Sequence, residues 1–444
     1  MANLLNAPYI KGEWGVPAKA ERLLHIWMIL VFLGLPISNS VLQYAGQKSF
    51  QEVYGLIYIV IFMVGIWIES LGKNRFPFLA IDILLFVVTI SGLFGIPNQF
   101  ASNTTAARAT IFYTLFLLLR NFSLFIMLPR TMVVTPGRMA EVAEKWLYRG
   151  TMILLVATFV YATSKGYTLT GKRFFEEQWL HPNWIAVYCG LVILLAVIGK
   201  HLTKFEKYSG LILAIYLELM MQSRAILVAL AGAFVVMYFF AVDQNKAKAF
   251  LTTLIGGLVA GGVLFALAPI LSEFEPIRNM IERTNTTDPT AGRIEMFQYA
   301  VEYWKESPIF GYGFNNGFQM DNFIAKYGTE TGIVGVVLYF LFLLALLFTS
   351  IKVYKRSVDP DIKYIAKLTI AFNSFVFFRS FAEATDLFHL SDIMSNAAFF
   401  WSGMTIAGTS TLALKVKETH TAAQTVTEYK IRAKAAESDQ VPTS

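Results

Sequence analysis

Long apolar runs with few charges recur along the chain up to about residue 410, and this feature constrains the fold more than any other. A membrane-spanning helix needs about 20 mostly apolar residues, because lipid offers backbone groups no hydrogen-bond partners. A transmembrane β-barrel would show short alternating segments instead. We therefore predict an all-α integral membrane protein with about twelve transmembrane helices, which begin near Leu23, Val53, Phe76, Ala107, Gly150, Trp184, Phe205, Ser223, Phe250, Ile333, Leu368 and Met394.

The composition agrees with a membrane location. Of the 444 residues, 56% are hydrophobic and only 15% are charged, whereas a soluble domain has about 25% charged residues. These values exclude a soluble enzyme, a nucleic-acid-binding domain and a disordered scaffold. The single cysteine, Cys189, lies within an apolar run, so no disulfide can form within the chain and stability must come from helix packing.

The distribution of Lys and Arg predicts the orientation. Twelve spans place 24 of these residues on the side of the N-terminus and 12 on the other side, whereas merging the seventh and eighth spans into one helix makes the two sides nearly equal. Since cytoplasmic loops carry the excess of Lys and Arg, we expect two separate spans and both termini in the cytoplasm.

The same topology divides the chain into a transmembrane domain and a tail. Residues 1–414 form the polytopic domain, and residues 272–331 form one large loop on the outward, periplasmic face that contains short helices. Long loops in compact proteins are often functional. Residues 415–444 are polar and rich in small side chains, which predicts a disordered cytoplasmic tail.

Two arginines in or beside predicted spans are candidates for anion binding. Arg120 lies near the middle of the fourth span, where it forms an ion pair with Asp82 or faces an anionic ligand in a polar cavity. Arg224 follows Ser223 at the outward junction of two spans. It either pairs with Glu218 or snorkels, or it binds a phosphate through two parallel hydrogen bonds.

The large loop contains a predicted helix. Pro289 marks its start, and the run of Gly311, Gly313 and Gly317 follows its end. Arg293 lies near the helix start, where free N–H groups and the helix dipole favour an anion. The alternative is an ordinary helix on the membrane surface, whose apolar face comprises Ile294, Phe297, Val301 and Trp304.

Carboxylates beyond the glycines are candidate general bases. Asp321 and Asn322 precede the next span, and Asp321 either accepts a proton from a sugar hydroxyl or caps the following helix. Glu330 is a second candidate.

Other polar residues lie at the outward ends of spans. His181 contacts a sugar or has a structural role, and Asn183 is a candidate cap of the sixth span. Arg379 pairs with Glu383 or Asp386 or assists anion binding.

Several chemistries lack support in the sequence. It contains no P-loop, no GxGxxG, no CxxC pair and no HExxH, and its five histidines are scattered. We therefore predict no metal site and no cofactor.

Taken together, "HPNW" before a span, "SRA" at a span junction, "GR…W…P…GYG" in a large loop and "DN…GIVG" at the next span resemble the O-antigen polymerase and O-antigen ligase superfamily. The resemblance covers residues 181–340. It implies a bacterial inner-membrane glycosyltransferase of the C-type fold, active at the periplasmic face, whose substrates are undecaprenyl-pyrophosphate-linked glycans.

The resemblance also implies roles for individual residues. Arg224 and Arg293 correspond to arginines expected to hold the donor pyrophosphate, and Asp321 remains the candidate general base on the grounds given above. The ligase branch typically has a histidine beside the asparagine, whereas this chain has Asp321 there, which favours a polymerase of O-antigen or exopolysaccharide. Residues expected to contact pyrophosphate or sugar are Arg120, Arg379, His181, Asn183, Tyr312, Asn322 and Glu330.

The expected partners are a lipid-linked oligosaccharide donor, a sugar or lipid-linked acceptor, the bilayer, a chain-length regulator and a flippase, and no nucleic acid. An O-antigen ligase acting on lipid A-core is the main alternative. A twelve-span secondary transporter is a third hypothesis, but such proteins place their sites at the midplane between repeated halves.

Overall fold

The structure is a computed structural model that describes residues 80–100, 104–127, 129, 136–169, 174, 181–240, 278, 293–314, 322–381, 383, 388 and 392–408. All regular elements within these ranges are helical. The spans predicted from Leu23, Val53 and Phe250 and the tail at 415–444 lie outside the described residues, as does most of the predicted loop before Arg293.

The described helices follow the order of the predicted spans. They are α4 (Ala80–Ile90), η1 (Ser91–Gly95), α5 (Ile96–Phe100), α6 (Thr104–Asn121), the π-helical turn η2 (Phe122–Met127), α8 (Pro136–Ser164), α9 (Pro182–Ile198), α10 (Lys204–Met221), α11 (Arg224–Phe240), α14 (Arg293–Glu306), α15 (Phe323–Arg356) and α16 (Pro360–Ser380). A last helix occupies 393–408.

Several of these helices have the length and apolarity of membrane spans. Within the described ranges, four segments meet both criteria: Ala80–Asn98, Thr104–Ile126, Gly137–Ser164 and Phe323–Arg356. Two shorter apolar helices, α9 and α11, accompany them. The membrane character predicted from the apolar runs is therefore supported, whereas the number of spans in the whole chain remains a prediction.

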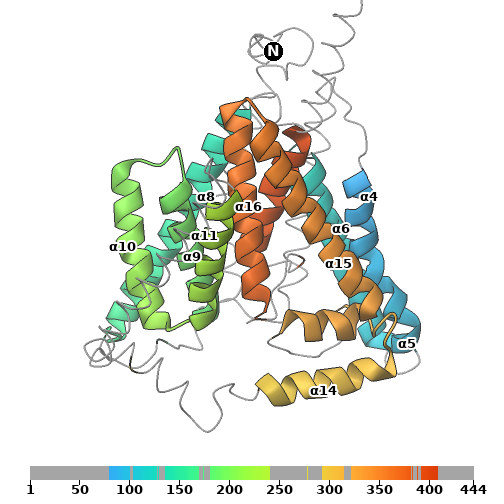
Figure 1. Cartoon of the computed structure of the whole chain (residues 1–444). Helices are drawn as coiled ribbons and strands as arrows, with labels where there is room; N and C mark the ends of the chain where they lie inside the picture. Colours follow the sequence, from blue (N-terminus) through green and yellow to red (C-terminus); the bar gives the residue numbers. More distant parts are fainter. Residues whose placement is uncertain are drawn as a thin grey trace, which may run out of the picture.

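The chain between residues 204 and 240 forms two helices, as the charge distribution predicts. Thr203 caps α10, and the helix ends at Gln222, whose φ of 54° is left-handed. Helix α11 then begins at Arg224 and returns along the bundle (Figure 1). The side-chain amine of Lys207 donates to the carbonyl of Gly199, so this lysine reaches back toward the end of α9.

Helix α8 begins earlier than predicted. We expected the fifth span to start near Gly150, but the helix starts at Pro136, and five charged residues lie between these two positions. The helical turns that carry these charges precede the apolar part of α8, and two of their side chains contact neighbouring helices: Glu144 contacts Tyr364 of α16 and Arg149 contacts Glu206 of α10. Length and hydropathy locate the apolar part of a helix, whereas its ends depend on these contacts.

The helices form a bundle with one helix lying across an end (Figure 1). Helix α9 packs on α10, and α16 packs on both α11 and α15. Helix α14 lies across the end where α9 and α11 start and where α16 stops, and the first turns of α15 lie beside it. The structure therefore gathers the outward-facing residues predicted from the sequence at one end of the bundle.

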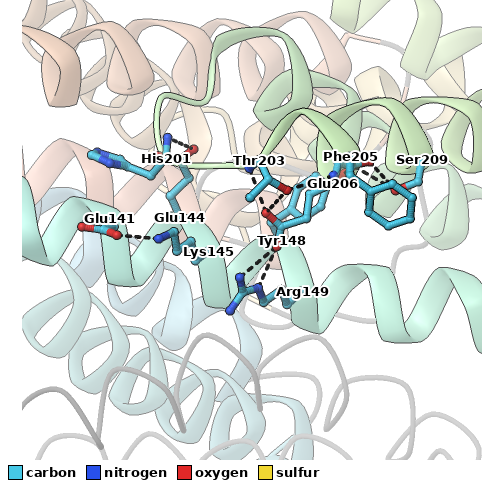
Figure 2. A network of polar contacts seen from close by, with 10 residues as sticks. All are labelled: Glu141, Glu144, Lys145, Tyr148, Arg149, His201, Thr203, Phe205, Glu206 and Ser209. Carbon is cyan, nitrogen blue, oxygen red and sulfur yellow. Dashed lines mark hydrogen bonds and ion pairs between the residues drawn. The ribbon is translucent and has the colours of Figure 1, made fainter.

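A network of hydrogen bonds and ion pairs joins helices at the opposite end of the bundle (Figure 2). The buried carboxylate of Glu144 accepts from the backbone N–H of His201 (3.0 Å) and from the hydroxyl of Tyr364 (2.7 Å). Glu206 completes a capping box with Thr203 and pairs with Arg149 at 2.9 Å. These contacts tie α8, the α9–α10 loop and α16 together.

Candidate functional site

Helix α15 is interrupted by a glycine. Gly332 has φ 63° and ψ −168°, a conformation that is accessible essentially only to glycine. The turns before it, Phe323–Thr331, fall in the last part of the predicted loop, which was expected to contain short helices, and they are helical. The break leaves backbone carbonyls and N–H groups without helical partners.

The segment from Ser307 to Phe314 fills this break. Backbone N–H groups of Tyr312 and Gly313 donate to the carbonyls of Thr329 (2.8 Å) and Glu330 (2.7 Å). In return, Ile333 and Val334 donate to Pro308 (2.9 Å) and Ile309 (3.3 Å). Non-helical backbone is tolerated at membrane depth only where protein surrounds it, and here each side of the break satisfies the other.

Glycines allow this close approach. Gly311 and Gly313 have φ of 64° and 89°, in the left-handed region that favours glycine. A Cβ on Gly311 would lie 2.6 Å from the carbonyl oxygen of Thr329. The "GYG" motif therefore serves to dock the loop against the broken helix.

Helices earlier in the chain form the other wall of the docked loop. The amide of Asn98 donates to the Ser307 hydroxyl (2.7 Å) and to the Gly311 carbonyl (2.9 Å). The Phe314 ring lies against Gly92, where a Cβ would come within 2.2 Å of it. The loop is thus held between α15 and the η1–α5 region.

Helix α14 packs on the first turns of α15 through its small and aromatic residues. Ala300 and Ala325 are both buried and in contact, and the ring of Trp304 covers Gly328. Trp304, which belongs to the predicted apolar face, therefore packs on α15. Phe297, on the same predicted face, is 42% exposed.

Tyr312 projects from the docked loop back onto α14. Its ring stacks on Tyr303 with centroids 4.3 Å apart and 23° between planes, and its hydroxyl donates to Glu306 Oε2 at 2.9 Å. Burial and the neighbouring carboxylate raise the pKa of Tyr312 to about 12. The hydroxyl therefore remains a donor at neutral pH.

Asn322 links the start of α15 to the end of α16. Its side-chain oxygen accepts from Ala325 N (3.2 Å) and its amide donates to the carbonyl of Phe381 (3.1 Å). Asn322, and not Asp321, therefore caps the helix, because the helix begins one residue later than a cap at Asp321 requires. Asp321 itself lies outside the described residues, and Glu330 is buried beside the break.

The two arginines expected to bind pyrophosphate both stand at helix starts. Arg224 is the exposed first residue of α11, directly after the buried Ser223. Arg293 is the first residue of α14. Both helix starts lie at the same end of the bundle (Figure 1).

Arg379 is buried between two carboxylates. Its guanidinium contacts Glu383 and Asp392, each at 2.8 Å. The pair with Glu383 matches the expectation of a local ion pair, and Asp386 lies outside the described residues. Asp392 was not foreseen. It also accepts from the N–H and the hydroxyl of Ser395, which anchors the helix at 393–408.

Arg120 is fully buried in the bundle. It donates twice to Asn121 Oδ1 (2.8 and 3.0 Å) and lies 4.4 Å from the centroid of the Phe399 ring. Asn121 in turn donates to Thr89 of α4 at 2.8 Å. Asp82 is also buried on α4, and its pairing with Arg120 stays a prediction.

His181 caps helix α9. Its Nδ1 accepts from the backbone N–H of Asn183 at 3.3 Å, so the expectation that Asn183 is the cap is wrong. Pro182 occupies the first helical position, which requires the cap one residue earlier.

The described residues therefore bring together the start of α15, the docked loop and α14, and they place Arg224 at the same end. Tyr303 and Glu306 both contact Tyr312, and the sequence did not predict these contacts. Among the side chains that the structure describes, no group of three or more His, Cys, Asp or Glu is arranged to hold a metal ion.

Comparison with known families identifies the same part of the chain. Residues 209–340 match the family described as O-Antigen ligase. The match confirms the resemblance to the O-antigen polymerase and ligase superfamily; it begins within α10, includes α11 and α14, and ends about halfway along α15. No curated protein matches the chain.

Proposed function

We propose that this protein is a membrane glycosyltransferase that polymerises O-antigen or exopolysaccharide repeat units carried on undecaprenyl pyrophosphate, at the periplasmic face of the bacterial inner membrane. The family match and the apolar helices support a multi-pass bacterial membrane enzyme of the O-antigen ligase or polymerase type. Polymerisation, the lipid carrier, the orientation and independence from metal ions are parts of the proposal.

One observation carries it. The segment that matches the family contains Arg224 and Arg293, and both begin helices at the end of the bundle where α14 and the broken α15 meet. A helix start offers free N–H groups and a positive dipole end, and an arginine adds a fixed positive fork. Two helix starts that each carry an arginine would provide one anion-binding group for each phosphate of a diphosphate.

The reaction needs little covalent chemistry from the protein. The hydroxyl oxygen of the acceptor sugar attacks the anomeric carbon of the donor, and the bond from that carbon to the pyrophosphate oxygen breaks. Undecaprenyl pyrophosphate leaves with the electron pair, and the hydroxyl proton passes to Asp321. Arg224 and Arg293 stabilise the charge that develops on the leaving oxygen, which is typically the largest catalytic contribution.

The remaining predicted residues would support this site. Tyr312 and Asn322 lie on the segments beside the break, where a glycan would pass. His181 and Asn183 lie at the start of α9, at the same end. Arg120 and Arg379 contact protein groups in the structure, so we assign them a supporting electrostatic role.

The proposal is tested with the purified full-length protein and a defined undecaprenyl-pyrophosphate oligosaccharide, with and without chelator. We expect elongation by the wild type in both conditions. Loss of either Arg224 or Arg293 to alanine should lower the rate about 100- to 1,000-fold, by analogy with a single oxyanion donor. Asp321→Asn should also lower the rate.

A matched control is Arg356→Ala. Arg356 is an exposed arginine in the last turn of α15, at the other end of that helix, so its loss should leave elongation unchanged. Full activity of both Arg224→Ala and Arg293→Ala would end the proposed mechanism.

A ligase is the second candidate, because the family model that matches is itself described as O-Antigen ligase. Products separate the two activities. Loss of a polymerase leaves lipopolysaccharide with a single repeat unit, whereas loss of a ligase leaves polymer on the lipid carrier and bare lipid A-core. A transporter would move the glycan without forming a bond.

A further inference from the structure

A stripe of tyrosines and carboxylates runs along α14. Glu295, Tyr299, Glu302, Tyr303 and Glu306 follow one another at helical spacing, so they share one side of the helix. We call this set the tyrosine stripe. Tyr299 is 65% exposed, and the side chain of Glu302 is 70% exposed.

Within the stripe, Tyr299 and Glu302 are exposed, whereas Tyr303 and Glu306 contact Tyr312 of the docked loop. Helix α14 contacts α15 through Ala300 and Trp304, which lie on an adjacent side of the helix. At 65% exposure, Tyr299 contributes little to the packing of α14 on α15. Tyr299 and the partly exposed pair of Tyr303 and Tyr312 therefore present aromatic rings at the end of the molecule that carries Arg224.

Tyr312 extends the stripe and holds it rigid. Its ring lies on Tyr303, and its hydroxyl binds Glu306. Its own backbone is fixed to α15 by the bond from Tyr312 N to Thr329 O. Binding to such a preorganised surface loses little side-chain entropy.

The chemistry of the stripe matches a sugar. A pyranose ring has a face of C–H groups, which packs on the electron-rich face of an aromatic ring. Its hydroxyls are donors that carboxylate oxygens accept. Glu295, Glu302 and Glu306 supply such oxygens beside the rings.

The charge of the stripe selects among sugars. The stripe contains three glutamates, and the neighbouring Lys305, which pairs with Glu302 at 2.6 Å, compensates the charge of only one of them. Uronic acids would be repelled by this surface. Neutral and N-acetylated sugars would not be.

We propose that Tyr299, Tyr303 and Tyr312, with Glu306, form a subsite that binds neutral or N-acetylated sugar residues of the glycan. This inference rests on the proposed function, because it names the class of sugar that the enzyme holds. The subsite lies outside the arginine pair and holds the chain by its rings rather than by its pyrophosphate.

The test measures glycan binding without transfer. Full-length protein in nanodiscs is titrated with hexasaccharides of glucose, galactose, N-acetylglucosamine and galacturonic acid, followed by saturation-transfer NMR. At least one neutral or N-acetylated hexasaccharide should bind, and the galacturonate should bind more weakly. Tyr303→Ala should raise the Kd of the bound hexasaccharide by about twofold to twelvefold, the range expected for loss of one aromatic stacking contact.

Two variants separate stacking from hydrogen bonding. Tyr312→Phe keeps the ring on Tyr303 but releases Glu306, so binding should weaken less than in Tyr303→Ala. Tyr208→Ala is the matched control, because Tyr208 is a 67% exposed tyrosine near the start of α10, at the other end of the bundle, and its loss should change nothing. Unchanged binding in Tyr303→Ala, or no binding of any neutral or N-acetylated hexasaccharide to the wild type, would overturn the subsite.

The polymerase proposal and the subsite proposal can be refuted independently of each other. Arg224→Ala should lose transfer and keep hexasaccharide binding. If the wild type elongates the glycan and Tyr303→Ala binds and elongates as well as the wild type does, the subsite is refuted and the polymerase proposal stands. Binding without elongation refutes the polymerase alone.

The bilayer is the other occupant to exclude. The only cysteine in the sequence, Cys189, is buried, so a fluorophore can be placed selectively at Tyr299→Cys. Brominated lipid should not quench the label. Quenching by the lipid would place the stripe in the membrane and refute the proposal.

Discussion

The break in α15 offers a sharp test of how the loop is held. In Gly332→Ala, the new Cβ would lie 2.2 Å from the carbonyl oxygen of Ile309 and 2.5 Å from the backbone N of Phe310. Contacts this short with backbone cannot be relieved by rotating a side chain. The docked loop must therefore withdraw from the break.

The cost has two parts. An L-residue in this conformation is strained by about 1–3 kcal/mol. Withdrawal also weakens the bonds from Ile333 N to Pro308 O (2.9 Å) and from Val334 N to Ile309 O (3.3 Å), each worth about 1 kcal/mol. We expect the free energy of unfolding to fall by about 3–5 kcal/mol, measured by denaturant titration in mixed micelles. Trypsin should also cut faster after Lys305.

Gly166→Ala is the control variant, because it introduces backbone strain without a steric clash of the new Cβ. Gly166 has φ 79°, but no heavy atom outside its own neighbours lies within 4 Å of the position of a Cβ. Its substitution should cost only the strain of about 1–2 kcal/mol. Equal losses of stability in the two variants would show that the loop is not wedged into the break, and the packing argument would be refuted.

Two more predictions concern charged and titratable groups. Arg379→Ala leaves Glu383 and Asp392 buried without their cation, so unfolding in mixed micelles should need about 3–5 kcal/mol less free energy; a loss below 1 kcal/mol would mean that water reaches the carboxylates. The pKa of Tyr312 is raised to about 12 in the folded protein, so its contribution to stability is complete below about pH 10 and is lost as the pH rises toward 12. Tyrosinate absorbance should contain a late step that disappears in Tyr312→Phe, and an unchanged titration curve would contradict the contact with Glu306.

Much of the architecture was predictable because lipid imposes a simple rule. A helix must be apolar over about 20 residues to cross a bilayer, and such runs can be read directly. The separation of α10 from α11 also followed from charge counting, and the structure locates the break at Gln222. The start of α8 was predicted too late because a charged helical turn looks like a loop when hydropathy is the only criterion.

The site was predictable in kind but not in detail. Glycines in "GYG" indicated the end of a helix, yet nothing in the spacing of Gly311 and Gly313 showed that this segment docks on Thr329 and Glu330, just before the break at Gly332. Similarly, Glu383 lies four residues from Arg379 on the same segment and was expected, whereas Asp392 reaches it across the fold.

The sequence by itself determined that this chain enters a membrane, where many of its helices lie, and which family its central third resembles, because these depend on local composition and short motifs. Only the tertiary structure decided that the "GYG" loop closes the break in α15, that Asn322 rather than Asp321 caps that helix, and that Tyr312 stacks on α14. These outcomes depend on backbone groups from distant segments satisfying one another, and no local pattern records which segments meet.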